Sequence, residues 1–352
     1  MGCSRIRASV LAVAALTGFG LGSVHADTIY LKGKNPIDGA DIQKETYKAV
    51  VYRKRPIPND IEIPMAEVQR VEYSRTDKDY VAGRDARKAG AYQDAIKAFQ
   101  DVSERSPYYQ YALFQIAESY FAMGQFDKAI SAYDDLLQKI KDTKFYPQAL
   151  AGKARSYAAS GKKADAKSAY QTLERETQSK GFDPSWEYDA KFQIAVLEGK
   201  GRNDFELMAR DFERKAPTIA AKARLQVGYT YVDEKKYSEA IDYFDRILAD
   251  EQATDSVRAG AWAGLSQCHI EKEGADEADF KEATLAALRT VLMYPDATDA
   301  MPRALFHAGR GFQLMRTPNT PWKRRANENY DKVIREYGST EWADKAKRFR
   351  DR

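Results

Sequence analysis

The sequence predicts a mainly α-helical protein, an α-α superhelical solenoid that follows a small N-terminal all-β domain. An internal repeat predicts the solenoid, because residues 90–96 (GAYQDAI) align with residues 124–130 (GQFDKAI) at an offset of 34. A change of hydrophobic period separates the two parts, with alternation before about residue 75 and helical spacing after about residue 80. With 43% hydrophobic and 31% charged residues, the chain can form a core and is not a disordered protein.

Residues 1–26 have the pattern of a cleaved secretory signal peptide. Arg5 and Arg7 form a basic start, residues 10–21 are apolar, and residues 24–26 (VHA) offer a small-residue cleavage site. The alternative, a membrane anchor, needs about twenty continuous apolar residues, whereas this stretch is shorter and broken by glycines. We therefore expect an exported protein without an integral membrane segment after cleavage, whose net charge falls from +4 to +2 with the loss of both arginines.

Residues 27–75 are expected to form the β domain. Runs rich in β-branched and aromatic residues at 28–31, 49–52 and 68–73 are separated by turn-forming glycines and prolines. Such short strands predict a small barrel or strongly bent sheet that docks on the helices after it. The segment resembles the small SH3-like or Sm-like β module at the front of some exported bacterial repeat proteins. Residues 27–79 carry ten basic and ten acidic residues, so RNA binding has no electrostatic support.

Residues 80–352 are expected to form an array of six to seven helix pairs plus a capping helix. A third copy of the repeat has its turn at Gly161, after three extra residues near residues 141–145, and a fourth clear copy contains Gly228 and Tyr237. Pro107 is expected to end the second helix of the first unit. Less regular helix pairs are expected at 186–197 with 205–214, 258–270 with 280–294, and 302–315 with 321–337, before a terminal helix at 342–350.

This repeat is similar to the tetratricopeptide repeat (TPR) family, whose unit is a helix, a turn and a helix. The family's small residue in the first helix is matched by Gly83, Ala117, Ala154 and Gly228. The segments 294–300 and 337–343 resemble the Tyr-Pro-x-Ser/Thr-x-x-Ala junctions of bacterial envelope repeat proteins. That group includes the cell-division coordinator of the Tol-Pal system and the lipoprotein of the outer-membrane barrel-assembly machine. The resemblance implies a periplasmic or secreted bacterial protein.

The family resemblance also implies a partner-binding concave face, lined by the first helices of successive units. The predicted inner residues of the first two units are Asp77, Tyr80, Arg84, Arg87, Lys88, Tyr111, Phe114, Glu118, Phe121 and Ala122. Basic and aromatic side chains together predict a groove for a protein or peptide partner. The alternative is that Tyr111, Phe114 and Phe121 pack against the next unit or under the β domain. The family's two-carboxylate clamp is not implied, because Tyr80 and Arg84 replace its lysine and asparagine.

Residues that carry catalytic or metal chemistry are scarce. The mature chain has one cysteine, Cys268, which excludes an intramolecular disulfide, and two histidines, His269 and His307, on separate predicted helices. The sequence has no phosphate loop, paired-cysteine spacing, His-Glu-x-x-His motif or Gly-x-Ser-x-Gly elbow. We therefore expect no catalytic residues, no metal and no cofactor, and predict that the protein is not an enzyme.

Together these observations predict a non-catalytic exported scaffold or adaptor that binds protein segments on its concave face and binds no nucleic acid. The alternative is a structural or assembly component of the cell envelope that acts by self-association or by contact with the cell wall or outer membrane. Residues 318–352 hold ten basic and six acidic residues, so the basic C-terminal repeat could contact an envelope surface. A solvated capping helix would account for the same charges.

Overall fold

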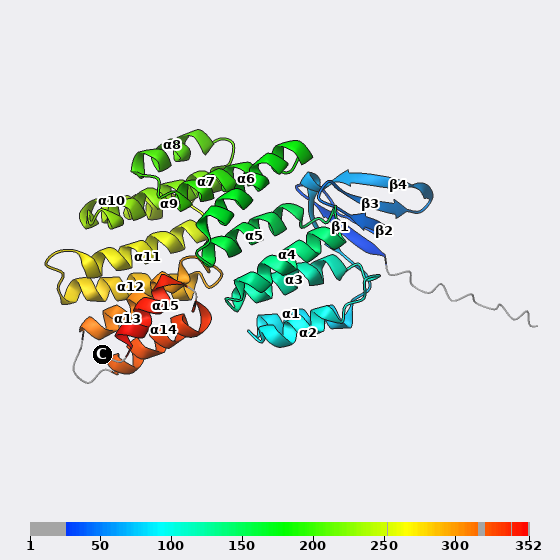
Figure 1. Cartoon of the computed structure of the whole chain (residues 1–352). Helices are drawn as coiled ribbons and strands as arrows, with labels where there is room; N and C mark the ends of the chain where they lie inside the picture. Colours follow the sequence, from blue (N-terminus) through cyan, green and yellow to red (C-terminus); the bar gives the residue numbers. More distant parts are fainter. Residues whose placement is uncertain (1–25, 252, 316–320, 339, 351–352) are drawn as a thin grey trace, which may run out of the picture.

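The computed structural model describes residues 26–251, 253–315, 321–338 and 340–350 of the 352-residue chain. Figure 1 shows a small sheet beside the first helices and a curved stack of helices that continues from it. The predicted signal peptide lies outside the described residues, apart from Ala26. The fold confirms the prediction of a small all-β part followed by a helical repeat array.

The β part consists of five strands and a single 3-10 turn, Met65–Glu67. The strands are β1 (Asp27–Leu31), β2 (Ile37–Glu45), β3 (Ala49–Lys54), β4 (Ile57–Pro64) and β5 (Val68–Glu72). They form an antiparallel sheet in the order β4-β3-β2-β1-β5. Each of the four strand pairings contains a register shift, which bends the sheet. Ile29, Val50 and Tyr52 are among the side chains of the small core that the bent sheet encloses.

The helices of the described chain form seven successive pairs and a last single helix. They are α1 (Lys78–Lys88), α2 (Tyr92–Gln100), α3 (Tyr109–Ala122), α4 (Phe126–Lys139), α5 (Tyr146–Ala159), α6 (Lys163–Lys180), α7 (Ser185–Leu197), α8 (Arg202–Phe212), α9 (Pro217–Asp233), α10 (Tyr237–Ala249), α11 (Asp255–Glu271), α12 (Glu277–Met293), α13 (Met301–Met315), α14 (Trp322–Glu336) and α15 (Glu341–Phe349). None of the helices in the described ranges is both long and apolar enough to cross a membrane.

The repeat pattern reflects close contact between an aromatic ring and a glycine. The rings of Phe99 on α2 and Phe244 on α10 lie where a Cβ would stand on Gly83 and Gly228 of the first helix of the same unit. Larger side chains at these glycines would force the paired helices apart. Each small residue of the repeat therefore marks a place where two helices approach closely.

A left-handed residue occurs in the turn inside several of the described units. Gly90, Gly124 and Gly161 have φ angles of 77°, 70° and 78°, which glycine adopts without a steric cost. Lys235 takes the same place in the fifth unit with a φ of 60°. The aligned glycines of the sequence repeat are thus explained by the backbone of this turn.

The prediction that Pro107 ends the second helix was wrong. Helix α2 ends at Gln100, and a turn-rich segment follows it. The Ser106 hydroxyl there donates to Asp77 Oδ2 at 2.6 Å and accepts from the amide of Tyr108 at 3.3 Å. This local hydrogen bonding competes with helix continuation, so α2 has nine residues whereas α4 has fourteen.

Candidate functional site

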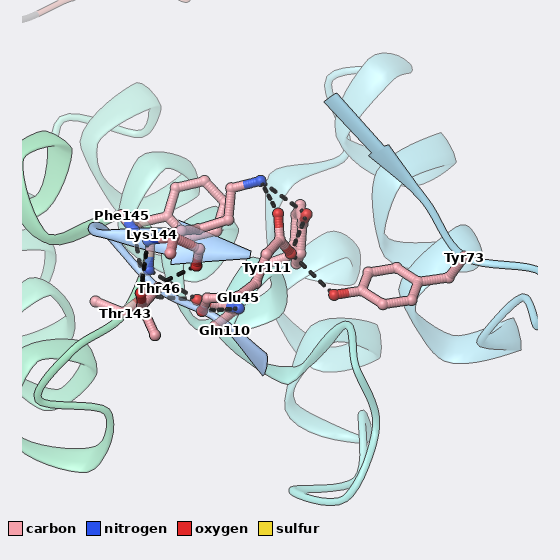
Figure 2. A network of polar contacts seen from close by, with 9 residues as sticks. Glu45, Thr46, Tyr73, Gln110, Tyr111, Thr143, Lys144 and Phe145 are labelled. Carbon is pink, nitrogen blue, oxygen red and sulfur yellow. Dashed lines mark hydrogen bonds and ion pairs between the residues drawn. The ribbon is translucent and has the colours of Figure 1, made fainter. Parts of the chain in front are cut away.

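A buried carboxylate joins the sheet to the helices (Figure 2). The side chain of Glu45, at the end of β2, is fully buried, and its Oε1 accepts from Lys144 Nζ at 2.5 Å. Its Oε2 accepts from the hydroxyls of Tyr111 at 2.7 Å and Tyr73 at 2.9 Å. Burial is the main cause that raises the pKa of both tyrosines, and the charge of Glu45 is the second cause. Both hydroxyls therefore stay protonated and act as donors.

The backbone of the β2–β3 turn also binds the array. Thr46 pairs with Thr143 of the α4–α5 loop as an isolated β-bridge, and the Tyr47 amide donates to the Asp142 carbonyl at 3.2 Å. Gln110 on α3 donates from Nε2 to the Glu45 carbonyl at 3.2 Å. Its Oε1 accepts from the Thr143 hydroxyl at 2.8 Å. The sheet is therefore fixed to the second and third units at once.

Three of the predicted partner-binding aromatics lie in a cluster beside this junction. The Tyr80 ring stacks on Tyr108 with centroids 4.7 Å apart, and the Phe114 ring stacks on Phe145 at 4.6 Å. The Tyr111 ring meets the edge of Phe145 at 5.1 Å. Tyr111 and Phe114 thus pack as the second interpretation of the sequence describes, against the β domain and the next unit.

The predicted residues Glu118 and Phe121 face a side chain that sequence reasoning missed. Arg155 on α5 donates from Nη2 to Glu118 Oε1 at 2.8 Å, and its guanidinium carbon lies 4.4 Å from the centre of the Phe121 ring. The Tyr133 hydroxyl donates to the same Glu118 carboxylate. Arg155 follows Ala154 as Glu118 follows Ala117, so extending the repeat register to the third unit could have found it.

The predicted partner-binding cations Arg84, Arg87 and Lys88 all lie on α1. Arg84 and Lys88 are exposed and one turn apart, and Arg87 is half-buried between them. Asp85, 3.3 Å from the Arg84 guanidinium, is the ion-pair partner that the described residues supply to this group. Arg87 Nε is buried and has no hydrogen-bond partner among the described residues. Arg84, Arg87 and Lys88 together therefore carry more positive charge than Asp85 balances.

An arginine of the C-terminal units packs between two aromatic rings. Tyr229 follows Gly228 as Arg84 follows Gly83, so it occupies the same repeat position. The guanidinium carbon of Arg303 on α13 lies 3.9 Å from the centre of the Tyr229 ring. The same guanidinium lies 4.9 Å from the Trp342 ring on α15. Arg303 therefore links the fifth unit to the last helix through these two rings.

Metal-ligating side chains are not clustered in the described ranges. No group of three or more His, Cys, Asp or Glu residues there could hold a metal ion. Cys268 is buried, and burial raises the pKa of its thiol to about 12, which disfavours the reactive thiolate.

The buried His307 is expected to make the stability of the array depend on pH. Burial lowers its pKa below the ordinary value, although Glu271 Oε1 lies 3.9 Å from its Nε2. Between the two pKa values, the imidazole of His307 is therefore protonated in the unfolded chain and neutral in the folded chain. The free energy of unfolding should fall by up to about 1.4 kcal/mol per pH unit as the pH drops below about 6.5 towards the folded pKa. Urea unfolding at several pH values, followed through the fluorescence of the neighbouring Trp342, measures this slope.

The His307→Gln variant is the control for this dependence, because glutamine does not titrate. We expect a lower stability with a flatter slope over the same pH range. Equal slopes in the two proteins would contradict the assignment to His307.

Comparisons with known proteins identify the repeat. Models of the tetratricopeptide repeat match residues 86–146 and 221–249. One similar solved structure is the C-terminal part of a TPR repeat-containing protein from Cytophaga hutchinsonii, with 14% identity, coverage of 76% of this chain and 98% of that chain, and a TM-score of 0.33. The search of curated proteins gave no match.

Two further solved structures are similar at the same low level. The TPR2AB domain of yeast Sti1, in a complex with pHSP90, has 15% identity, coverage of 78% and 96%, and a TM-score of 0.29. The TPR domain of P58(IPK) has 14% identity, coverage of 77% and 64%, and a TM-score of 0.29. The family models and the repeat register together show that the chain contains tetratricopeptide repeats.

Proposed function

Because the chain carries tetratricopeptide repeats, a fold that generally mediates protein–protein interaction, we propose that it is a non-catalytic, exported scaffold that binds a protein segment on the concave face of its N-terminal units. The observation that carries the proposal is the cation group of α1, formed by Arg84, Arg87 and Lys88. Two of these cations are exposed, and the third has a buried nitrogen without a hydrogen-bond partner among the described residues.

The charge of this face favours an acidic partner segment. Arg84 and Lys88 are exposed, so carboxylates of the partner can reach both cations. Next to α1 along the array, Glu118 and Arg155 neutralise each other. The adjoining part of the face would therefore add apolar contact at Phe121 rather than net charge.

The docked sheet supports the same location. Glu45 and Tyr73 cover Tyr111 at one end of α3, whereas Glu118 and Phe121 lie about two turns further along that helix. A partner segment would thus pass beside the junction and over the second half of α3. Arg303 on the later units is half-buried against Trp342, whereas Arg84 and Lys88 of the first unit are exposed.

Site-specific photo-crosslinking in the native cell tests this function. A photo-reactive amino acid at Ala122, a predicted inner residue, should capture a partner protein, and one at the exposed Gln171 of α6 should not. The Arg84→Glu/Lys88→Glu variant should reduce the capture at least tenfold, since both charges are reversed and repel acidic groups. Cell fractionation, with sequencing of the mature N-terminus, tests export.

The matched control reverses two exposed lysines on second helices, Lys163→Glu/Lys281→Glu, so the net charge change is the same. Capture from Ala122 should survive in this control. Equal capture from Ala122 and Gln171, or capture unaffected by reversal of the α1 charges, would refute the concave face as the binding site.

A further inference from the structure

A second groove lies on the opposite side of the first two units from the predicted face. It is bounded by α2, α3 and α4, and has a volume of about 460 Å³. Leu113, Ile116 and Ala132 form its apolar floor together with Phe99. Helix α2 ends at Gln100 and is five residues shorter than α4. The side of the groove formed by α2 is therefore shorter than the side formed by α4.

The shape of this groove matches a helix. Its α3 side is the stripe Tyr109, Leu113, Ile116 and Tyr120, with the spacing of one helix face. This stripe is about 16 Å long, or three helical turns. Such a trough between ridges is the surface on which an amphipathic helix packs its apolar side.

The rim charges show which helix the groove fits. Lys128, Asp135 and Lys139 lie on one face of α4 along the groove, and none of them forms an ion pair with a described residue. The two ammonium groups instead lie over the rings of Tyr120 and Tyr109, at 5.6 and 6.0 Å. The rim therefore offers a positive charge at each end and a negative charge between them, while Asp127, beside Lys128, is paired with Lys162.

We propose that this convex groove, defined by α2, α3 and α4, binds an amphipathic helix of a partner protein whose flank carries acidic residues eleven positions apart with a basic residue between them. The spacing follows from Lys128 and Lys139, and the basic residue stands opposite Asp135, four or seven positions from the first acidic residue according to helix direction. The site is separate from the concave face and does not depend on the function proposed for it.

Two synthetic helical peptides of about sixteen residues and equal composition test the charge order. The matched peptide has glutamates eleven positions apart, lysines four and seven positions after the first, and leucines on the adjacent stripe. The mismatched peptide exchanges the glutamates with the lysines. Fluorescence anisotropy with the full mature chain should show at least about tenfold tighter binding of the matched peptide, with a difference that shrinks at high salt.

Three variants assign the binding to the groove. Lys128→Glu/Lys139→Glu should reverse the order of the two peptides, and Ser131→Trp, at an exposed rim position, should block both. Lys163→Glu/Lys281→Glu, with the same charge change outside the groove, should leave the preference intact. Circular dichroism confirms that each variant is folded.

Binding of neither peptide, equal affinity of the two, or an order unchanged by the rim reversal would overturn the proposal. The Arg84→Glu/Lys88→Glu variant separates the two surfaces, because it should bind the matched peptide as the parent chain does. A loss of peptide binding in that variant would place the peptide on the concave face and likewise refute the groove.

Discussion

Replacing Glu45 with alanine is expected to lower the free energy of unfolding by about 3–5 kcal/mol and to release the sheet from the array. The substitution leaves Lys144 with no carboxylate inside a junction where its side chain is 18% exposed. It also removes the acceptor of the Tyr73 and Tyr111 hydroxyls. Each buried donor left without a partner adds its own desolvation cost.

Urea unfolding and limited proteolysis measure the two effects. Proteolysis should become faster in the link at residues 74–77, because an undocked sheet no longer protects it. Glu67→Ala is the matched control, since it removes an exposed ion pair with Lys34 and should cost less than about 1 kcal/mol. A Glu45→Ala protein as stable as Glu67→Ala would contradict the assigned role of the buried carboxylate.

The double variant Glu45→Leu/Lys144→Met separates charge from shape. Removing both charges avoids an unpaired buried ion, so part of the lost stability should return. A loss of stability in the double variant equal to the sum of the two single losses would show that the hydrogen bonds of the tyrosines, rather than the ion pair, hold the junction.

The sequence pattern predicted the array well because each unit repeats the same local solution. The glycines of the turns inside the units recur at a fixed spacing. The contacts between an aromatic ring and a helical glycine recur in the same way, so the alignment alone located most helices. The end of α2 could not be predicted from Pro107, because the serine-based turns before it stop the helix first. Helix ends set by side-chain hydrogen bonds carry no periodic signal.

The junction shows why part of the candidate site escaped prediction. The three extra residues before the third unit were visible in the sequence, yet their partner lies about a hundred residues earlier, as in the contact between Glu45 and Lys144. No spacing rule connects these positions. By contrast, Arg155 occupies the same repeat position as Arg84 and Glu118, so its place on the face follows from the register.

Replacing Phe244 with alanine is expected to cost about 3–5 kcal/mol, because its ring is fully buried and alanine leaves a cavity. The ring contacts glycines on both neighbouring first helices, Gly228 of its own unit and Gly264 of the next. Thermal and urea unfolding give the loss. Tyr243→Ala, at a half-buried aromatic on the same helix, is the control and should lose less stability.

The position of Phe244 makes its loss more than local. The stability of a repeat array is approximately a sum of unit terms and nearest-neighbour interface terms. Because Phe244 contributes to one unit and to the interface with the next, its removal should split the unfolding of the array into two transitions, with hydrogen exchange faster in α11 than in α5. A single transition shifted without such a difference would show that the two halves remain coupled through other contacts.

A reciprocal change of size tests the contact itself. A Cβ on Gly228 would lie 2.4 Å from the Phe244 ring, so Gly228→Ala should cost about 1–3 kcal/mol despite the higher helix propensity of alanine. Adding Phe244→Leu makes room for the new methyl group, and the double variant should be more stable than the sum of the single losses predicts. Strict additivity, measured by urea unfolding, would show that the glycine is needed for the backbone rather than for the ring.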